Sequence, residues 1–239
     1  MKTKKFALLI ILSMLVTGFA GAGSYIVEDD IYYNPNDKNP VVEKKEKEAQ
    51  KELQEKREMV EDLKNDRKPY RAELKRARQE LQNILSTQYG RTIHVNIFAD
   101  LFDITDEEWK NAIEGRMGRV KHSLVTAPEY TLDAAKAFRK MKQMKGIEDV
   151  ELMDTAAIVR DKPNADENTL YECVRAEEAY VDTCLKRYLG RIKKCETVEE
   201  LHETRDGVTK DCYSYSNYIF RHLRKNDYEK YACIGTKVS

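Results

Sequence analysis

The sequence predicts an α+β domain of short strand–helix units over residues 89–239, behind a long helical arm. Three observations predict this fold class. Apolar residues repeat in heptads between residues 43 and 88, they alternate with polar residues just after Gly90, and capped helices then follow between short apolar stretches. Charged residues make up 35% of the chain and hydrophobic residues 41%, which is typical of one modest core with a solvated extension.

Residues 1–22 have the pattern of a signal peptide. Lysines at three of the first five positions precede an apolar run over residues 6–19, and small residues follow up to Ala22. The run of about 14 residues is short for a membrane-spanning helix, which needs about 20. We therefore expect cleavage near Ala22 and export as a periplasmic or secreted protein. The alternative is an uncleaved leader. In that case the leader would attach the protein to a membrane, and we expect no other membrane attachment. Residues 23–42 contain two Asn-Pro pairs and are predicted to form a linker.

A coiled-coil helix is predicted over residues 43–88. Its register breaks at Pro69, because proline removes a backbone donor and clashes with the preceding turn, and we expect Pro69 near a helix start. The alternatives are a lone solvated helix and a helical hairpin folded back on itself. The core positions are Leu53, Val60, Arg67, Leu74 and Leu81 at position a and Ala49, Lys56, Leu63, Tyr70, Ala77 and Ile84 at position d, and all but two of them are apolar or aromatic.

The predicted domain opens with a strand and a capped helix. Ile93, Val95 and Ile97 alternate with polar residues, which is the period of a strand. A helix is expected over residues 106–114, with Thr105 as its cap. The expected capping partner is Glu108, and the side chains expected in the core are Trp109, Ala112 and Ile113.

The middle of the domain continues this alternation. Residues 119–127 are a second strand candidate, and Pro128 suits the first turn of a helix that is expected to end near Lys145. Residues 150–159 are predicted to be a third strand. Residues 161–168 are predicted to be a loop.

The last part of the chain is predicted to consist of two helices and two extended stretches. Residues 207–223 alternate in part and are rich in tyrosine, so strand is predicted there, with helix as the alternative. The other elements are a helix over Thr169–Leu189, a short strand over residues 190–196, and a helix over residues 198–205 with Thr197 and Glu200 as its capping box.

These units resemble a known fold. The stretch "IHVNIFADLFDITDEEWKNAIEGRMGRVKHSLVTAPEYTLDAAKAFRKMKQMKGIEDVELMDTAAI" resembles the hinge domain of SMC-type ATPases. It is more similar to the hinge-like region of large SMC-like, MukB-like proteins, including the SMC-like subunit of Wadjet plasmid-defence systems. "YLGRIKKCETVEEL" and "GVTKDCYSYSNYIFRHL" continue the same order, so the resemblance covers about residues 89–235.

The resemblance implies a non-enzymatic architectural domain that self-associates as a homo-oligomer, with DNA as a candidate partner and a cytoplasmic location. The sequence lacks the P-loop pattern G-x-x-x-x-G-K-[ST] of the ATPase heads, so we expect an arm and a hinge detached from those heads. The leader favours the alternative, which is an exported coiled-coil scaffold or interaction protein of the cell envelope with no nucleic-acid role.

The sequence offers little for catalysis or metal binding. The four histidines fall in separate predicted elements, and no G-x-S-x-G or comparable Cys/His pattern occurs. No C-x-x-C spacing occurs either. We therefore expect no enzyme activity, no cofactor, no metal and no small-molecule substrate.

Two basic groups are candidate nucleic-acid contacts. Lys and Arg equal Asp and Glu at 42 each, so overall charge does not indicate a nucleic-acid binder. The stretch "GRMG" at residues 115–118 matches the G-x-x-G loop that clamps nucleotide backbones, although four residues are a weak signal and a turn that ends a helix is the usual reason for such a match. If the basic groups converge, they form a phosphate-binding surface. The candidates are Arg116, Arg119 and Lys121 around this loop and Arg139, Lys140 and Lys142 on the next helix.

Five cysteines lie in the last third of the chain. In an exported protein, an odd count predicts disulfides and one free thiol. An antiparallel return about a midpoint near residue 203 would pair Cys173 with Cys233 and Cys195 with Cys212, and it would leave Cys184 free. Cys173 and Cys184 are about 16 Å apart if they share a helix, so they cannot pair with each other. The alternative, which follows from the cytoplasmic resemblance, leaves all five reduced.

Overall fold

The computed structural model describes residues 44–45, 47–50, 53–54, 57, 68 and 70–235. The chain divides into two compact units, Met1–Glu48 and Ala49–Ser239. The described residues of the first unit are helical, and so are those of the second unit up to residue 57. The predicted leader, linker and much of the arm lie outside the described residues. Within the part that is described, no helix is both long and apolar enough to cross a membrane.

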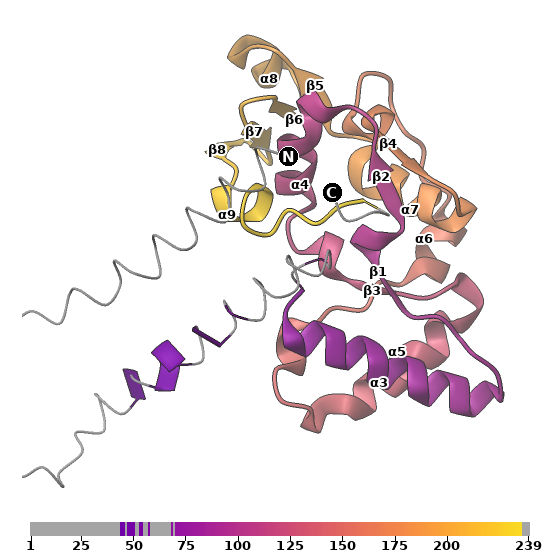
Figure 1. Ribbon diagram of the computed structural model, residues 1–239. Helices are drawn as coiled ribbons and strands as arrows, with labels where there is room; N and C mark the ends of the chain where they lie inside the picture. Colours follow the sequence, from indigo (N-terminus) through magenta and orange to yellow (C-terminus); the bar gives the residue numbers. More distant parts are fainter. Residues whose placement is uncertain are drawn as a thin grey trace, which may run out of the picture. The chain divides into compact units, whose positions relative to one another are not determined.

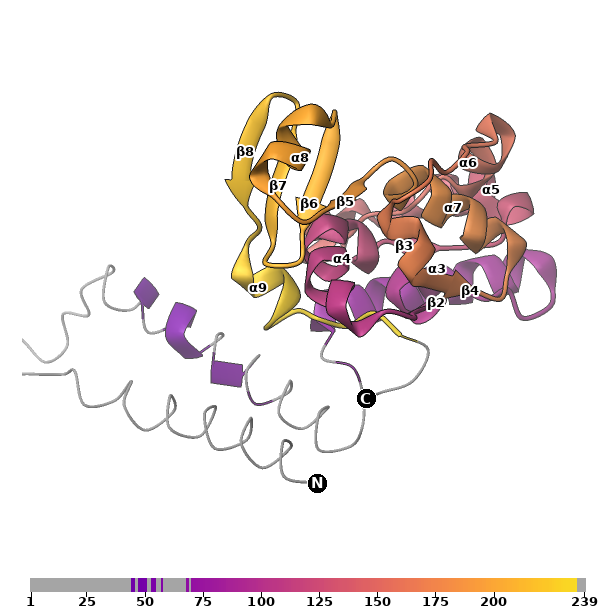
Figure 2. The ribbon, with the colours of Figure 1, turned by 90° about the horizontal axis from the view of Figure 1, so that it is seen from above.

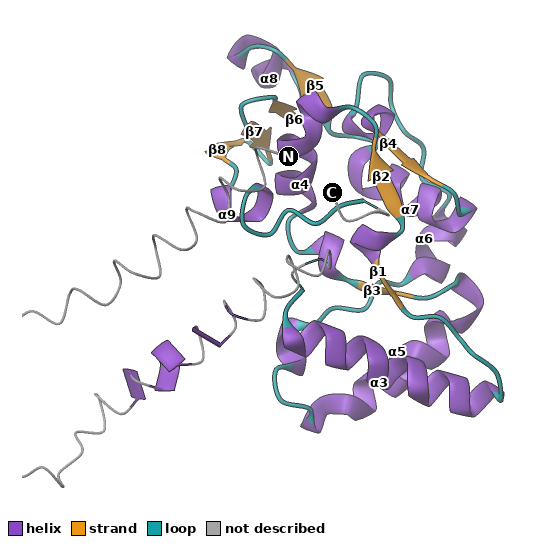
Figure 3. Cartoon of the chain, viewed as in Figure 1, coloured by secondary structure: helices purple, strands orange, loops and turns teal. Residues whose placement is uncertain are grey.

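The structure confirms the α+β fold class, with short strands set among many helices (Figure 3). One end of the domain is a pair of packed helices, α3 (Ala72–Tyr89) and α5 (Thr131–Lys140) (Figure 1). Leu74, Ala77 and Leu81 of the predicted heptad stripe are buried, but they pack inside this domain. From Ala72 onward, the helix assigned to the arm therefore belongs to the folded domain.

The alternation after Gly90 forms a short antiparallel ladder beside this helix pair. Strand β1 (Asn96–Ile97) pairs with β3 (Leu124–Val125). Ile93 and Val95 are buried whereas His94 is exposed, as the predicted strand period requires. The ladder lies between the two large apolar clusters, since Ile97 and Leu124 pack with α3 while Val125 packs with the second cluster.

The second apolar cluster is built around helices α4 (Lys110–Met117) and α7 (Ala179–Leu189). Trp109, Ala112 and Ile113 are buried in it, as predicted. A short 3-10 turn, Glu107–Trp109, leads into α4, and its cap is Asp106 and not Thr105. The Asp106 carboxylate accepts the Glu108 backbone N–H at 3.0 Å. A strand pair covers the cluster, formed by β2 (Phe102–Ile104) and β4 (Val174–Ala176).

Two predicted elements are wrong. Residues 150–159 were expected to be a strand, but helix α6 (Thr155–Asp161) begins there, because the Asp154 carboxylate caps it by accepting the Ala157 N–H. The helix expected from Thr169 begins only at Ala179, because the residues before it pair with β2 as strand β4. Cys173 and Cys184 therefore do not share a helix.

A four-stranded sheet forms the other end of the domain, in the order β5-β6-β7-β8. Helix α8 (Val198–Glu203) lies over one face, and the Thr197 hydroxyl caps it at Glu200, as predicted. Helices α4 and α9 (Lys225–Tyr228) meet the opposite face, and β8 is outermost (Figure 2). The Tyr-rich stretch is strand, as predicted. The strands are β5 (Lys193–Cys195), β6 (Asp206–Thr209), β7 (Tyr213–Ser216) and β8 (Ile219–His222), with β5 parallel to β6 and the other pairs antiparallel.

The glycines of "GRMG" have structural roles in this arrangement. A Cβ on Gly115 would lie 2.8 Å from the Leu223 side chain, so only glycine lets the chain after β8 approach α4 this closely. Gly118 ends α4 with a φ of 47°, a backbone conformation that favours glycine. The motif is therefore accounted for by packing and by a helix end, without a nucleotide.

Candidate association surface and candidate nucleic-acid contacts

Strand β8 leaves an apolar sheet edge open to solvent. All four of its residues are exposed, and among the described residues β7 is its one strand neighbour. The exposed fractions of Tyr218, Ile219 and Phe220 are 94%, 54% and 37%. Proteins usually protect an edge strand with lysine, proline, a bulge or a covering segment. Strand β8 carries the charged Arg221, but no proline. Three adjacent apolar or aromatic side chains beside it therefore indicate a contact surface.

The tip of the β7–β8 hairpin is a two-residue turn in the left-handed region. Asn217 and Tyr218 have φ values of 51° and 62°, as a turn of two left-handed residues between paired strands requires. Asparagine tolerates this conformation, whereas tyrosine seldom adopts it. Residues held in sparsely populated backbone conformations cluster at functional sites.

A row of rings supports Phe220 from beneath. The Phe220 ring stacks on Tyr213 with centroids 5.8 Å apart and on His202 with centroids 6.4 Å apart. Tyr215 packs against it at 4.4 Å. Because these rings fix the Phe220 side chain before any partner arrives, less side-chain entropy is lost on binding. The partial alternation of residues 207–223 predicted strand here, but the open edge could not be predicted without the strand order.

Two of the predicted nucleic-acid contacts are internal. The Lys121 ammonium and the Glu114 carboxylate are 2.7 Å apart, and each side chain is 1% exposed. Arg116 points into the domain and bonds the Asp206 carboxylate at 2.6 Å. Neither Lys121 nor Arg116 is free to meet a phosphate, because both neutralise carboxylates inside the domain. The prediction that these two contact nucleic acid is therefore corrected.

Arg119 alone of the first group faces solvent, and it lines a pocket of about 560 Å³. Arg71 and Arg224 line the same pocket, from the segment before α3 and from the segment before α9. The pocket is mixed in charge, because four carboxylates also line it, and the Glu151 carboxylate lies 3.1 Å from the Arg119 guanidinium. The four are Glu73, Asp149, Glu151 and Asp227. Arg71 is positioned by the Tyr231 ring, 5.7 Å away.

The second predicted group lies elsewhere on the domain. Arg139 and Lys140 end α5, Lys142 lies in the turn after it, and all three are exposed. Within the part of the chain that the structure describes, none of the three has an ion pair. Lys140 lines a different groove, together with Arg76 of α3. The structure therefore does not merge the two predicted groups into one pocket.

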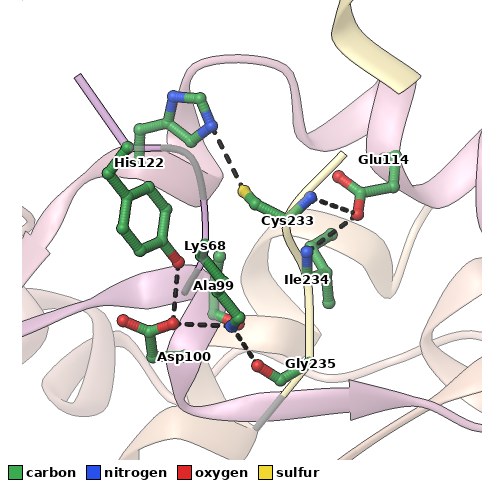
Figure 4. Close-up of polar contacts among 9 residues, drawn as sticks. Lys68, Ala99, Asp100, Glu114, His122, Cys233, Ile234 and Gly235 are labelled. Atoms are coloured by element: carbon green, nitrogen blue, oxygen red, sulfur yellow. Dashed lines mark hydrogen bonds and ion pairs between the residues drawn. The ribbon is translucent and has the colours of Figure 1, made fainter. Parts of the chain in front are cut away.

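The C-terminal tail is held by a buried polar network that the sequence did not predict (Figure 4). The Glu114 carboxylate accepts the backbone N–H groups of Cys233 at 2.9 Å and of Ile234 at 2.8 Å. The Lys68 ammonium bonds Asp100 at 2.6 Å and also the Gly235 carbonyl. This one ammonium thus connects the segment before α3 to the end of the tail.

Cys233 and His122 lie in this network but do not form an active nucleophile. Their Sγ and Nε2 atoms are 3.3 Å apart. Burial raises the pKa of the Cys233 thiol to about 12, and burial together with the nearby Lys121 and Arg71 charges lowers the pKa of His122 to about 4. Both groups are neutral near pH 7, whereas a reactive cysteine needs its thiolate.

All five cysteines are buried free thiols in the structure. The antiparallel return that would have paired them does not occur. Strand β5 runs parallel to β6 and places Cys195 opposite Thr209. Cys173 belongs to the apolar cluster around α7, whereas Cys233 packs with the cluster around α3. The predicted Cys173–Cys233 and Cys195–Cys212 bridges are therefore absent from this fold.

Among the described residues, no group of three or more His, Cys, Asp or Glu side chains is arranged to hold a metal ion. An open groove of about 1350 Å³ lies between α8 and β5. It is lined by lysine, arginine, aspartate and glutamate together, and Phe220 reaches its margin.

The chain is similar in fold to solved SMC hinge domains. No protein-family model and no curated protein matches it. The Pyrococcus furiosus SMC hinge domain is 19% identical, with 62% of this chain and 86% of that chain covered and a TM-score of 0.45. The S. pombe Smc5/6 hinge domain is 10% identical, with 93% and 84% covered and a TM-score of 0.45. An asymmetric dimer of the Geobacillus stearothermophilus SMC hinge domain is 15% identical, with 71% and 78% covered and a TM-score of 0.42. These likenesses concern the fold, and the MukB-like subtype is not distinguished by them.

Proposed function

We propose that this chain is a non-enzymatic association domain that binds a second copy of itself through the β8 edge. The observation that carries the proposal is the open edge with Tyr218, Ile219 and Phe220 exposed together. Backbone groups of an unpaired edge bind another strand readily, and exposed aromatic side chains supply apolar area to the same contact. The proposed role is architectural, without chemistry of its own.

Ile219→Lys is expected to weaken self-association of the full chain at least about tenfold. Ile219 is half exposed, so lysine there adds a charge to the edge with little effect on the core. Sedimentation equilibrium should show a dimer of the unsubstituted chain at micromolar concentration and a shift of Ile219→Lys toward monomer. Leu132→Lys is the matched control, because Leu132 is 68% exposed on α5. Dimers equally tight in both variants, or a strict monomer throughout, would refute the proposed edge contact.

A second candidate function is sequence-independent contact with DNA. Arg71, Arg119 and Arg224 line one pocket, and their guanidinium groups would have to bind the oxygens of a phosphate backbone in competition with four carboxylates of the same pocket. The exposed Arg139, Lys140 and Lys142 are a second group that could extend such a contact. No base-reading helix is implied, so the binding would be electrostatic.

Alanine at Arg71, Arg119 and Arg224 is expected to weaken DNA binding alike for every sequence. In a plot of log affinity against log salt, the slope should fall by about one for each lost phosphate contact. Fluorescence anisotropy with two unrelated duplexes at several salt concentrations measures both effects. Arg175→Ala provides an exposed control outside the pocket. If the unsubstituted chain shows no binding even at low salt, the association role alone remains.

The cell compartment separates these two functions. The leader pattern supports export, where the domain would meet envelope proteins, and the hinge resemblance supports the cytoplasm, where it would meet DNA. Fractionation of the native protein, with mass spectrometry of its N-terminus, decides between a processed exported chain and a retained one. A chain cleaved near Ala22 and found outside the cytoplasm would leave self-association as the proposed function.

A further inference from the structure

The tip of the β7–β8 hairpin presents apolar side chains on a protruding turn. The hairpin stands at the end of the domain away from α3 and α5 (Figure 2). Asn217 and Tyr218 form its turn, and Ile219 and Phe220 follow directly on β8. Tyr218 is 94% exposed and Ile219 is 54% exposed. A protruding apolar tip can enter a deformable surface, whereas a folded protein would need a matching cavity to receive it.

Basic residues accompany this tip, and acidic residues are missing from its part of the chain. The whole sequence has 42 basic and 42 acidic residues. Residues 212–226 nevertheless contain no aspartate or glutamate, and they include Arg221, Arg224 and Lys225. A strand rises about 3.3 Å per residue, so the Cα of Arg221 lies about 10 Å along the strand from that of Tyr218. A cation is thus placed one step behind the apolar side chains.

A second segment brings another cation to the same end of the sheet. Asp206 pairs with the last residue of β7, so the exposed Arg205 before it lies beside the tip. The Asp206 carboxylate is neutralised by the Arg116 guanidinium, 2.6 Å away. The exposed guanidinium groups of Arg205 and Arg221 exceed the charge of Glu203, which is exposed at the end of α8. The surface around the tip therefore complements an anionic partner.

We propose that the hairpin tip binds the surface of an anionic lipid bilayer. Tyr218, Ile219 and Phe220 enter the interface between water and hydrocarbon, and Arg205 and Arg221 bind the lipid phosphates. Aromatic rings with one polar end suit this interface. Interfacial segments bury their apolar side chains by about 5–10 Å, and the strand from Tyr218 to Phe220 spans about 7 Å.

This contact goes beyond the proposed function, because it does not need the pairing of two copies. It is also separate from the leader, through which alone the sequence predicted membrane attachment. A nucleic acid suits the tip less well than a bilayer does. The half-exposed Ile219 offers no side-chain hydrogen bond to a base or a phosphate, whereas it gains by leaving water for the lipid interface.

Cosedimentation of the full chain with vesicles tests the contact. Vesicles with equal amounts of phosphatidylcholine and phosphatidylglycerol should bind the chain more tightly than vesicles of phosphatidylcholine alone. Arg221→Gln should weaken this binding about fivefold, the usual contribution of one basic residue near an anionic surface. Tyr218→Asp should weaken it at least about tenfold, because it removes the ring and adds a charge that anionic lipid repels. Leu132→Asp is the matched control, since Leu132 is 68% exposed on α5, and it should change the binding little.

A tryptophan at the tip reports its entry into the interface. The chain has one tryptophan, Trp109, which is buried and provides a constant background. The fluorescence of Tyr218→Trp should shift to shorter wavelength when the phosphatidylglycerol vesicles are added, because the indole ring leaves water. The fluorescence of Leu132→Trp should not shift.

The outcomes separate this contact from the proposed function. The inference is overturned if the unsubstituted chain does not bind the anionic vesicles at low salt, or if Tyr218→Asp and Leu132→Asp weaken the binding equally. Binding of DNA that depends on Tyr218, without binding of vesicles, assigns the tip to nucleic acid and overturns it as well. Sedimentation without lipid measures self-association. A dimer that does not bind vesicles keeps the proposed function and removes the membrane contact, and a monomer that binds vesicles through Tyr218 does the reverse.

Discussion

Glu114→Gln is expected to lower the free energy of unfolding by about 3–5 kcal/mol, because it leaves the buried Lys121 ammonium without its counter-charge. The two side chains are each 1% exposed and their charged atoms are 2.7 Å apart. Glutamine keeps the size of the side chain and one carbonyl acceptor, so the loss comes mainly from the charge. Urea denaturation of the full chain at pH 7 measures the change.

The same substitution at a surface pair is the control. The Glu229 carboxylate pairs with Lys225 at 3.4 Å, and both side chains are exposed. Exposed pairs contribute about 0–1 kcal/mol, so Glu229→Gln should change stability little. The double variant Glu114→Gln/Lys121→Met should recover part of the loss, because it removes both buried charges. If Glu114→Gln and Glu229→Gln lower the free energy of unfolding equally, the buried ion pair stabilises the fold no more than the surface pair does.

The buried pair also connects the fold to the proposed association surface. The Lys121 ammonium donates to the Asp227 carbonyl in α9 at 2.5 Å, and α9 directly follows β8. The Leu223 side chain between them packs over Gly115 of α4. Loss of Glu114 should therefore loosen α9 and the tail before the α3–α5 pair. Faster amide hydrogen exchange at Cys233 and Ile234 in Glu114→Gln is the expected local sign.

Local patterns in the sequence were sufficient to predict the elements that depend only on neighbouring residues. The Thr197 cap, the alternation of Ile93 and Val95, and the burial of Trp109 all follow from spacing within about ten residues. The strand β4 could not be predicted in this way. Its partner β2 is about seventy positions earlier, and a helical pattern after Thr169 continues smoothly through it.

The site was less predictable than the fold, because exposure is decided by distant segments. Lys121 is in a basic stretch that looks solvated, and charged residues are seldom buried. The tail at Cys233 covers both Lys121 and Glu114, although Cys233 is more than a hundred positions further along the chain than either residue. Conversely, Phe220 and Ile219 are in an apolar stretch that suits a core strand, and only the strand order places them at an open edge.

The unfolding free energy is expected to fall by up to about 3 kcal/mol, through His122 alone, as pH drops from about 6.5 to about 4. Burial is the main cause of the lowered pKa of His122, and the Lys121, Arg71 and Arg119 charges add to it. The unfolded chain binds a proton near pH 6.5, whereas the folded chain resists one until about pH 4. The unfolded state therefore holds more protons in this window, and stability is fully present only above it.

The variant His122→Gln isolates this contribution, because glutamine does not titrate. Denaturation curves at pH steps between 7 and 4 should show the unsubstituted chain losing more stability than His122→Gln, whatever the offset between them at pH 7. Carboxylates titrate in both proteins, so their effect cancels in the difference. His94→Gln is the matched control, since His94 is exposed, and its curve should follow that of the unsubstituted chain. Curves for His122→Gln and the unsubstituted chain that stay parallel would show that His122 is not the buried neutral group described here. Because His122 contacts Cys233, its protonation is expected to release the tail first, so exchange of the Ile234 amide should quicken as pH falls toward 4.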